Sequence, residues 1–371
     1  MYKKFFMGIA AMAALTLVSC SSDDLNSLSD NSSKNEAISF DGYLGRSAVA
    51  VNGSRGSVVD IPALKNTDTD KKGFGVFGYY STTDHSATEQ SFNANLFNNE
   101  QVTCSKDGTD WTYTPLKYWP AQGHVDFLAY APYVDGKTLK ENSSSIDFAV
   151  SETIANQTDL LWANAENKTK DNLSSEEKNK VKFQFGHALS RLGYSVKLKD
   201  ASYESVATIT LNKITLAGSK DQKQNAFYKE GTIDLATGNW STSSSTAPNY
   251  NDTKRNFGWF NNETSGEKLS YNKAFENSDN EYLFVIPQDF SKTEPNSDQL
   301  YVIVEYTIQY SGGTAKPTVS YKVYKKLDKN FEQGKAYKIN LTIGLTPIEF
   351  NADVTAWGDD SDCNYDIDSW E

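Results

Sequence analysis

Residues 301–326 read YVIVEYTIQYSGGTAKPTVSYKVYKK, and they indicate the fold more directly than any other stretch of the chain. In the first half, apolar side chains occupy alternate positions, at Val302, Val304, Tyr306, Ile308 and Tyr310. Gly312 and Gly313 supply a turn, after which a second alternating row follows at Val319, Tyr321 and Val323. A period of two on both sides of a glycine turn predicts an antiparallel β-hairpin with one buried face.

The same alternation recurs along most of the chain. It is found in four further rows: Val181, Phe183, Phe185; Tyr194, Val196, Leu198; Tyr337, Ile339, Leu341, Ile343; and Ile348, Phe350, Ala352, Val354. The main helical indication is a capping box at Ser174–Glu177. We therefore predict a mostly-β protein with two antiparallel β-sandwich domains in tandem, residues 37–182 and 183–371, divided where the helical segment ends.

The composition excludes several classes of function. The chain has 371 residues, a formal net charge of −12 and a pI near 4.9, with no basic stripe that could neutralise nucleic-acid phosphates. Aromatic residues make up 13% of it, which provides a core and excludes global disorder. Three dispersed histidines offer no metal site, so we predict no metal and no cofactor.

The first twenty residues have the pattern of a secretory signal. Lys3 and Lys4 precede an apolar run over residues 5–18 that is too short to span a bilayer. Leu17-Val18-Ser19-Cys20 resembles a bacterial lipobox, so we predict a signal peptide over residues 1–19 and acylation of Cys20. The polar residues 20–36 would form a flexible tether to the outer membrane. The alternative is an ordinary signal peptide in which the cysteine is incidental.

Arginine is scarce, and its positions are informative. Only four occur, and Arg46 and Arg55 follow one short segment closely. Residues 37–44 place Ile38, Phe40 and Leu44 on one face of a predicted strand. Cleavage after either arginine, in small-residue stretches that a protease can thread, would separate this strand from the domain. The alternative is two arginines placed on the surface by chance.

Two other motifs have a structural explanation that we prefer. Residues 73–78, Gly-Phe-Gly-Val-Phe-Gly, match a dinucleotide fingerprint, which works only at a strand-to-helix turn. Tyr79-Tyr80-Ser81-Thr82-Thr83 follows it and does not favour a helix, so we predict a closely packed strand. We interpret His187 as a hydrogen-bonded structural residue. Carboxylates are scattered and no acid/base pair can be selected, so we predict no enzymatic activity.

The aromatic block from Trp111 to Pro132 allows two interpretations. Trp111, Tyr118 and Trp119 could form a platform for sugar rings, or they could be packed aromatics of a strand region. The packed arrangement is our preferred interpretation. Cys104 and Cys363 would remain in the mature chain, and the sequence does not establish whether they pair.

These residues together resemble the fimbrillin family, the type V pilins of Bacteroidota. Besides the lipobox and the Ile38-x-Phe40 strand, the resemblance rests on Trp111-x-Tyr113-x-Pro115, Tyr118-Trp119-Pro120, Val125-Asp126-Phe127-x-Ala129-Tyr130-x-Pro132, Asp159-Leu160-Leu161-Trp162-Ala163, Phe185-x-His187-Ala188-Leu189-x-Arg191-Leu192, Phe331-x-x-Gly334-Lys335-x-Tyr337, Ile348-x-Phe350 and Val354-x-x-Trp357. The resemblance implies transthyretin-like sandwiches and a surface lipoprotein without catalysis. It also implies an Arg-specific protease that removes the first strand, Arg55 fitting the processing site somewhat better than Arg46.

In the family, the groove left by that strand accepts a strand of another pilin subunit, so the resemblance implies a fimbrium that serves adhesion to a host or bacterial receptor. The donor strand would come from the C-terminal region, with Ile348, Phe350 and Val354 or with Tyr365 and Ile367. The acidic extension 358–371 departs from relatives that end soon after the closing tryptophan. The alternative function is a glycan-binding surface lipoprotein of the outer membrane, and a surface glycoside hydrolase is a more remote one.

Overall fold

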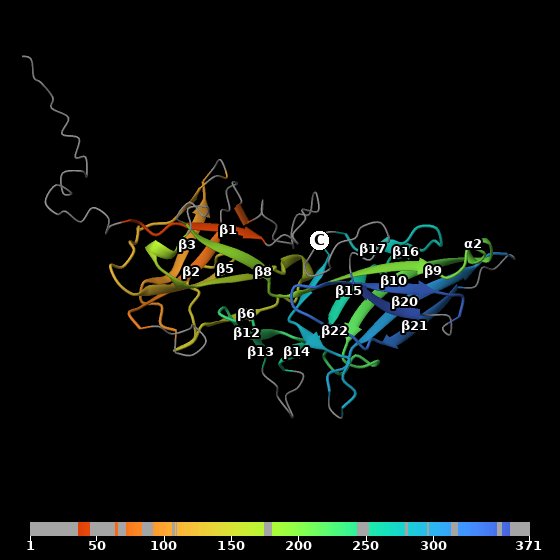
Figure 1. The fold of residues 1–371 in the computed structure, drawn as a ribbon. Coiled ribbons are helices and arrows are strands. Elements are labelled where there is room, and N and C mark those ends of the chain that lie inside the picture. Colours follow the sequence, from red (N-terminus) through yellow and green to blue (C-terminus); the bar gives the residue numbers. More distant parts are fainter. Residues whose placement is uncertain are drawn as a thin grey trace, which may run out of the picture.

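The computed structural model describes residues 36–44, 64–65, 72–83, 92–105, 108, 110–173, 180–242, 252–278, 281–294, 297–312, 318–346 and 351–356. The described chain is built almost entirely of β-strands that form several sheets, which confirms the mostly-β prediction. Figure 1 shows two lobes side by side, the first with β1, β2, β3, β5 and β8 and the second with β9, β10, β20 and β21. No helix in the described ranges combines the length and the hydropathy of a membrane-spanning helix.

The first lobe is a seven-stranded sheet in the order β1-β8-β7-β5-β2-β3-β4. Its strands are β1 (Phe40–Leu44), β2 (Phe74–Ser81), β3 (Phe97–Cys104), β4 (Trp111–Thr112), β5 (His124–Ala131), β7 (Leu161–Lys168) and β8 (Val181–His187). All pairs are antiparallel except β1 with β8, which are parallel. The inner face carries a core, which we call the first core, built around Phe74, Phe97, Phe127 and Phe183.

The second lobe is dominated by two five-stranded sheets, ordered β15-β10-β20-β21 and β17-β9-β23-β24, with β16 beside β10 and β18 beside β9. Their strands are β9 (Ser190–Leu198), β10 (Ala207–Ala217), β15 (Phe257–Asn261), β16 (Glu267–Lys268), β17 (Phe275–Glu276), β18 (Leu283–Val285), β20 (Tyr301–Tyr310), β21 (Thr318–Lys326), β23 (Ala336–Ile343) and β24 (Asn351–Ala356). The predicted hairpin is present, because β20 pairs antiparallel with β21 from Tyr301–Lys326 to Gln309–Thr318. The inner faces contribute to a larger cluster, which we call the second core.

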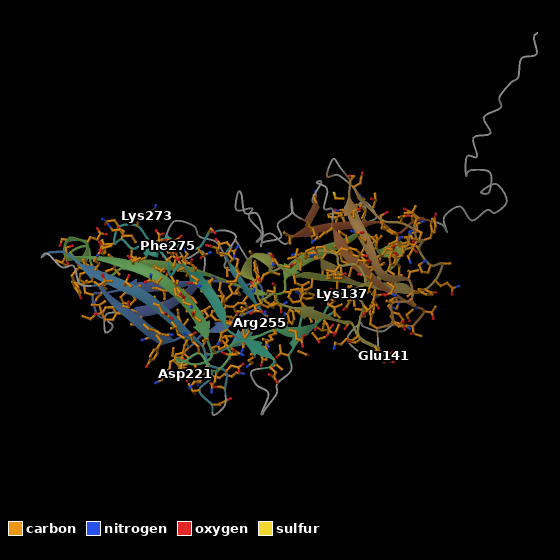
Figure 2. All side chains as sticks on the ribbon, turned by 180° about the vertical axis from the view of Figure 1, so that it is seen from behind. Lys137, Glu141, Asp221, Arg255, Lys273 and Phe275 are labelled. Atoms are coloured by element: carbon orange, nitrogen blue, oxygen red, sulfur yellow. The ribbon has the colours of Figure 1, made fainter. Side chains whose placement is uncertain are left out.

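One small sheet joins the two halves of the sequence. In the order β13-β12-β6, strand β6 (Ser145–Ala149) pairs with β12 (Glu230–Asp234), which pairs with β13 (Trp240–Ser241). Side chains of the first sheet, among them Leu128 and Tyr130, belong to the second core. Strand β5 is therefore buried at all eight positions, one face on each core. In Figure 2, Arg255 lies in the middle of the molecule and Lys137 and Glu141 lie on the side of the first lobe.

The remaining elements are short. They are β11 (Phe227–Tyr228) with β14 (Lys254–Arg255), β19 (Gln288–Asp289) with β22 (Asn330–Phe331), the 3-10 turns η2 (Ile154–Asn156) and η3 (Lys170–Asn172), and α2 (Tyr203–Val206). Strand β8 ends at His187 and β9 begins at Ser190, so the expected boundary at 182/183 falls within β8, which pairs with the first sheet. The capping box over residues 174–177 lies outside the described residues.

All of the glycine motif at residues 73–78 except Gly73 lies in strand β2, as the packing interpretation predicts. At Gly75 an added Cβ would overlap Tyr130 Cε1 and lie 2.9 Å from Asn99 Oδ1. At Gly78 it would lie 2.8 Å from Phe97 Cδ2. The glycines thus let β2 approach the rings of the neighbouring strands, and no nucleotide site is needed to explain them.

We expect Gly75→Ala to lower the free energy of unfolding by about 1–3 kcal/mol, because the new methyl group overpacks a filled site. Tyr130 cannot turn aside without loss, since its hydroxyl donates to Asn99 Oδ1 at 2.6 Å. Gly186→Ala on β8 is the matched control, because its Cβ would approach nothing closer than Trp162 Nε1 at 3.9 Å. Urea unfolding of the two variants measures the difference, and equal stabilities would contradict this packing explanation.

Candidate functional site

The candidate site is the part of the first lobe on which the N-terminal segment packs, and we call this part the seat. The N-terminal segment is residues 36–44. Within it, β1 pairs in parallel with β8, from Phe40–Val181 to Leu44–Phe185. At its other end, Ala37 forms an isolated bridge with Tyr118, in the chain that follows β4. There Ile38 N donates to Lys117 O at 2.8 Å, and Trp119 N donates to Glu36 O at 3.1 Å. The segment therefore pairs with β8 at one end and with the chain that follows β4 at the other, and Figure 1 shows β1 alongside β8.

Three side chains of the segment fill the first core. Ile38, Phe40 and Leu44 are exposed to only 1%, 1% and 4%. The Phe40 ring contacts four other rings at centroid distances of 5.4–5.6 Å, those of Phe97, Tyr113, Phe127 and Phe183. These are distances at which aromatic pairs add to the free energy of burial. The face predicted from the alternation is therefore the face that the structure buries.

A buried phenol holds the backbone of the segment. Tyr113 Oη donates to Ile38 O at 2.7 Å. Burial raises the pKa of Tyr113, so the phenol keeps the proton that it donates. At the solvent side, Glu36 pairs with Lys170 at 3.0 Å, but both side chains are at least one-third exposed and such a pair contributes little. The segment is thus held mainly by apolar contacts and backbone hydrogen bonds.

Strand β8 depends on the segment for most of its pairing. Residues Val181–Phe185 pair with β1, whereas β7 pairs with β8 only at Leu161–His187 and Trp162–Gly186. No hairpin ties β1 to its partner, because the two strands are more than 130 residues apart in sequence. The segment could therefore leave without any hairpin between β1 and β8 being disrupted. Its loss would leave five residues of β8 without this partner and an empty space in the aromatic core.

Most of the other predicted site residues lie outside the described residues. These are Cys20, Arg46, Arg55, Ile348, Phe350, Tyr365 and Ile367, together with Cys363. Val354 lies in β24, pairs with Ile339 and packs half-buried against the second core. Cys104 is buried in the first core. The processing arginine and the donor strand stay predictions, and whether Cys104 and Cys363 pair stays an open question.

The structure weakens the sugar-platform interpretation. Trp111 and Trp119 are exposed to only 8% and 6% and pack on Phe74 and Phe127. A ring must be open to solvent to stack on a sugar, and of the three predicted platform residues only Tyr118 is open, at 50%. The preferred interpretation of the block as packed aromatics is the one that these two tryptophans support.

His187 has a structural environment. Its Nδ1 lies 2.9 Å from Asp159 Oδ2, and both side chains are buried at the end of β8. The described residues contain no group of three or more His, Cys, Asp or Glu side chains placed to hold a metal ion. The local sequence pattern does not indicate that the N-terminal segment packs on Phe97, Tyr113, Phe127 and Phe183. The alternation of residues 181–185 predicts that Phe183 points inward. It does not predict which strand packs against Phe183.

One protein family and several solved structures are similar to this chain. The model of the family described as fimbrillin-like matches residues 63–357. A fimbrial protein from Bacteroides vulgatus has a similar fold, with a TM-score of 0.66, 22% sequence identity and coverage of 87% of this chain and 99% of that chain. The tip fimbrial protein Mfa3 from Porphyromonas gingivalis, with a C-terminal truncation, also matches, with a TM-score of 0.34, 11% identity and coverage of 76% and 100%. No curated protein matches the chain.

Proposed function

Because this chain belongs to the fimbrillin-like family, we propose that it is a pilin, a structural subunit of a cell-surface fimbria of Bacteroidota that serves adhesion. The family is one of structural and adhesion proteins, not of enzymes. In this proposal the precursor reaches the outer membrane as a lipoprotein anchored at Cys20. Its partners are other pilin subunits, an Arg-specific protease and a surface receptor.

The observation that carries the proposal is the N-terminal segment, whose apolar face is buried in the first core although no hairpin connects it to its partner strand. It contributes Ile38, Phe40 and Leu44 to the first core, and it is held on β8 by backbone pairing and side-chain contacts, without a turn between the two strands. Arg46 follows the last residue of β1 by two positions and Arg55 by eleven. In the proposal, cleavage after Arg55 or Arg46 frees the segment, and a strand of the next subunit takes its place.

Refilling the groove would supply enough free energy for a stable filament. Burying three large apolar side chains contributes roughly 5–9 kcal/mol, at about 1.5–3 kcal/mol each. The incoming strand also restores the backbone pairing of β8, as in other cases of β-augmentation. Since the donor and acceptor surfaces differ, the contact is heterologous and extends into a filament instead of closing a dimer.

The finer assignments belong to the same proposal. The two lobes would be transthyretin-like sandwich domains that meet between β8 and β9, a few residues after the predicted boundary at 182/183, behind a signal peptide over 1–19 and a tether over 20–36. The donor strand would carry Ile348, Phe350 and Val354, or Tyr365 and Ile367 from the extension 358–371. Among the described candidates, Val354 packs against the second core and would have to leave it to donate.

Limited digestion with an Arg-specific protease tests the proposal. We expect cleavage after Arg55 or Arg46 only, because Arg191 is exposed to 2% and Arg255 lies half-buried in β14. The cut chain should then form a ladder of oligomers that survives gel filtration, as donor strands replace the lost segment.

The matched control is the double variant Arg46→Gln/Arg55→Gln, which should stay intact and monomeric under the same treatment. An excess of a synthetic peptide of residues 36–44 should suppress the ladder formed by the cut chain. A cut chain that stays monomeric at high concentration, or an uncut variant that oligomerises equally, would contradict strand exchange.

A further inference from the structure

Strand β21 is an open edge of the second lobe. Among the described strands it pairs only with β20, and most of its nine residues are exposed. Figure 1 shows it at the rim of the lobe. An edge strand of this length has a row of backbone groups that can pair with another strand, and natural proteins usually cover or block such edges.

The two faces of β21 differ in chemistry. On the inner face Val323 is buried, Tyr321 stacks on Tyr306 at 5.3 Å, and Val319 is 38% exposed. The apolar row is thus covered at one end and open at the other. The outer face is basic: Lys322 and Lys326 lie on it, and the Lys220 ammonium lies 5.6 Å from the Tyr324 ring. Two carboxylates, Glu305 and Asp328, pair with the first two of these lysines.

The extension 358–371 has the complementary pattern. Residues 362–368 read Asp-Cys-Asn-Tyr-Asp-Ile-Asp. As a strand, one face would carry Cys363, Tyr365 and Ile367, and the other face would carry Asp362, Asp366 and Asp368. The apolar face suits the inner row of β21, and the acidic face suits its outer lysines.

We propose that residues 362–368 add to β21 of the same chain as an antiparallel edge strand. One register satisfies both faces: Tyr365 opposite Val323, Ile367 opposite Tyr321, Asp362 opposite Lys326 and Asp366 opposite Lys322. A shift by one residue would turn the aspartates onto the inner face, so the alternation allows few registers.

The chain can reach this position. Strand β24 ends at Ala356, opposite Tyr337, and β21 ends at Lys326, opposite Tyr301. These two ends lie at the same end of the lobe, because Lys329, three residues after Lys326, places its ammonium 5.5 Å from the Tyr337 ring. Five residues lie between Ala356 and Asp362, and the six Cα-to-Cα steps span up to about 20 Å, whereas packed sheets are about 10 Å apart.

The docked segment would cover the edge of the second lobe in the monomer and keep the chain from pairing edge to edge. It would also hold Tyr365 and Ile367 on their own chain until they are released. The inference goes beyond strand exchange in the first lobe, because it concerns the uncut monomer and holds whether or not the chain polymerises.

Disulfide trapping tests the register. In the full chain with Cys20→Ser, we expect Lys325→Cys to form an intrachain disulfide with Cys363, because opposite residues of antiparallel strands have the Cα separation that a disulfide needs. Lys322→Cys is the matched control, since it lies three residues away on the outer face. The first variant should oxidise at least about tenfold faster than the second. Buried Cys104 does not compete. Peptide mass spectrometry identifies the bond.

Three results would overturn the proposal: equal rates for the two variants, no disulfide in either, or a disulfide between two chains, which would place the segment on a second copy. Deletion of residues 358–371 provides an independent measurement. It should raise hydrogen exchange at the edge amides of β21 at least about tenfold and leave β8 unchanged, as expected when backbone pairing is lost locally. Unchanged exchange in β21 would also overturn the proposal.

Discussion

Replacing Phe40 by alanine is expected to lower the free energy of unfolding of the first lobe by about 3–5 kcal/mol. The Phe40 side chain is 1% exposed and its ring contacts four others, so alanine leaves a cavity among side chains fixed on different strands. The seat cannot collapse around the smaller side chain, because Phe97, Phe127 and Phe183 belong to three separate strands of one sheet.

Hydrogen exchange in urea measures this loss lobe by lobe, since amides of β8 report the first lobe and amides of β9 the second. The matched control is Tyr43→Ala on the same strand. Tyr43 is 39% exposed and makes one long hydrogen bond to Gln184, at 3.4 Å, so we expect a change within about 1 kcal/mol. Similar effects of the two substitutions would show that the buried face of β1 does not stabilise the lobe.

The same variant bears on strand exchange. After cleavage, a segment with alanine at position 40 should leave its groove faster, because the main apolar anchor is gone. The oligomer ladder should then appear sooner than with the natural segment. A slower ladder would contradict the proposal that release of this segment opens the groove.

The sequence could predict the strands whose two faces differ. Alternation indicated β8, β20, β21 and β23, because half-buried strands repeat with a period of two. It also indicated β9, although the structure buries every residue of that strand except Lys197. It also indicated which side chains of residues 37–44 face inward. Strand β5 gives no such alternation, since both of its faces are buried.

Partner strands could not be predicted in the same way. The parallel pairing of β1 with β8 joins residues more than 130 positions apart, and the pairing of β6 with β12 joins the two halves of the chain. Such pairs depend on how whole sheet faces pack together. A short stretch of sequence does not contain that information. For the same reason the sequence did not establish that Trp111 and Trp119 pack inward instead of forming a platform.

The second large effect is expected from Asp298→Ala in the second lobe. Asp298 Oδ1 contacts Lys254 Nζ, and the Lys254 side chain is only 3% exposed. Gln288 Nε2 donates to the other carboxylate oxygen at 2.6 Å, and the Lys254 ammonium lies 4.3 Å from the Tyr228 ring centroid. Burial lowers the pKa of Lys254, and Asp298 opposes that effect. Removing the carboxylate should lower the free energy of unfolding by about 3–5 kcal/mol, because a buried ammonium loses its counter-charge.

The double variant Lys254→Met/Asp298→Leu should recover most of this loss, since apolar side chains of similar volume often replace a buried ion pair at little cost. Glu263→Ala is the matched control: Glu263 pairs with Lys213 at 3.0 Å but is 63% exposed, so we expect a change within about 1 kcal/mol. Urea unfolding of the three variants measures these differences. If the double variant is as unstable as Asp298→Ala, the loss comes from packing and not from the unpaired charge.

The pH dependence of stability also distinguishes an unpaired buried charge from a loss of packing. In Asp298→Ala the pKa of Lys254 should fall further below its ordinary value, so that the unfolded chain binds more protons than the folded one. The stability of this variant should therefore rise as the pH increases from the folded pKa toward about 10.4, where the unfolded lysine also loses its proton. The double variant has no lysine at this position and should not show that rise relative to the parent. A pH profile for Asp298→Ala that parallels the profile of the double variant would exclude an unpaired buried ammonium as the source of the instability.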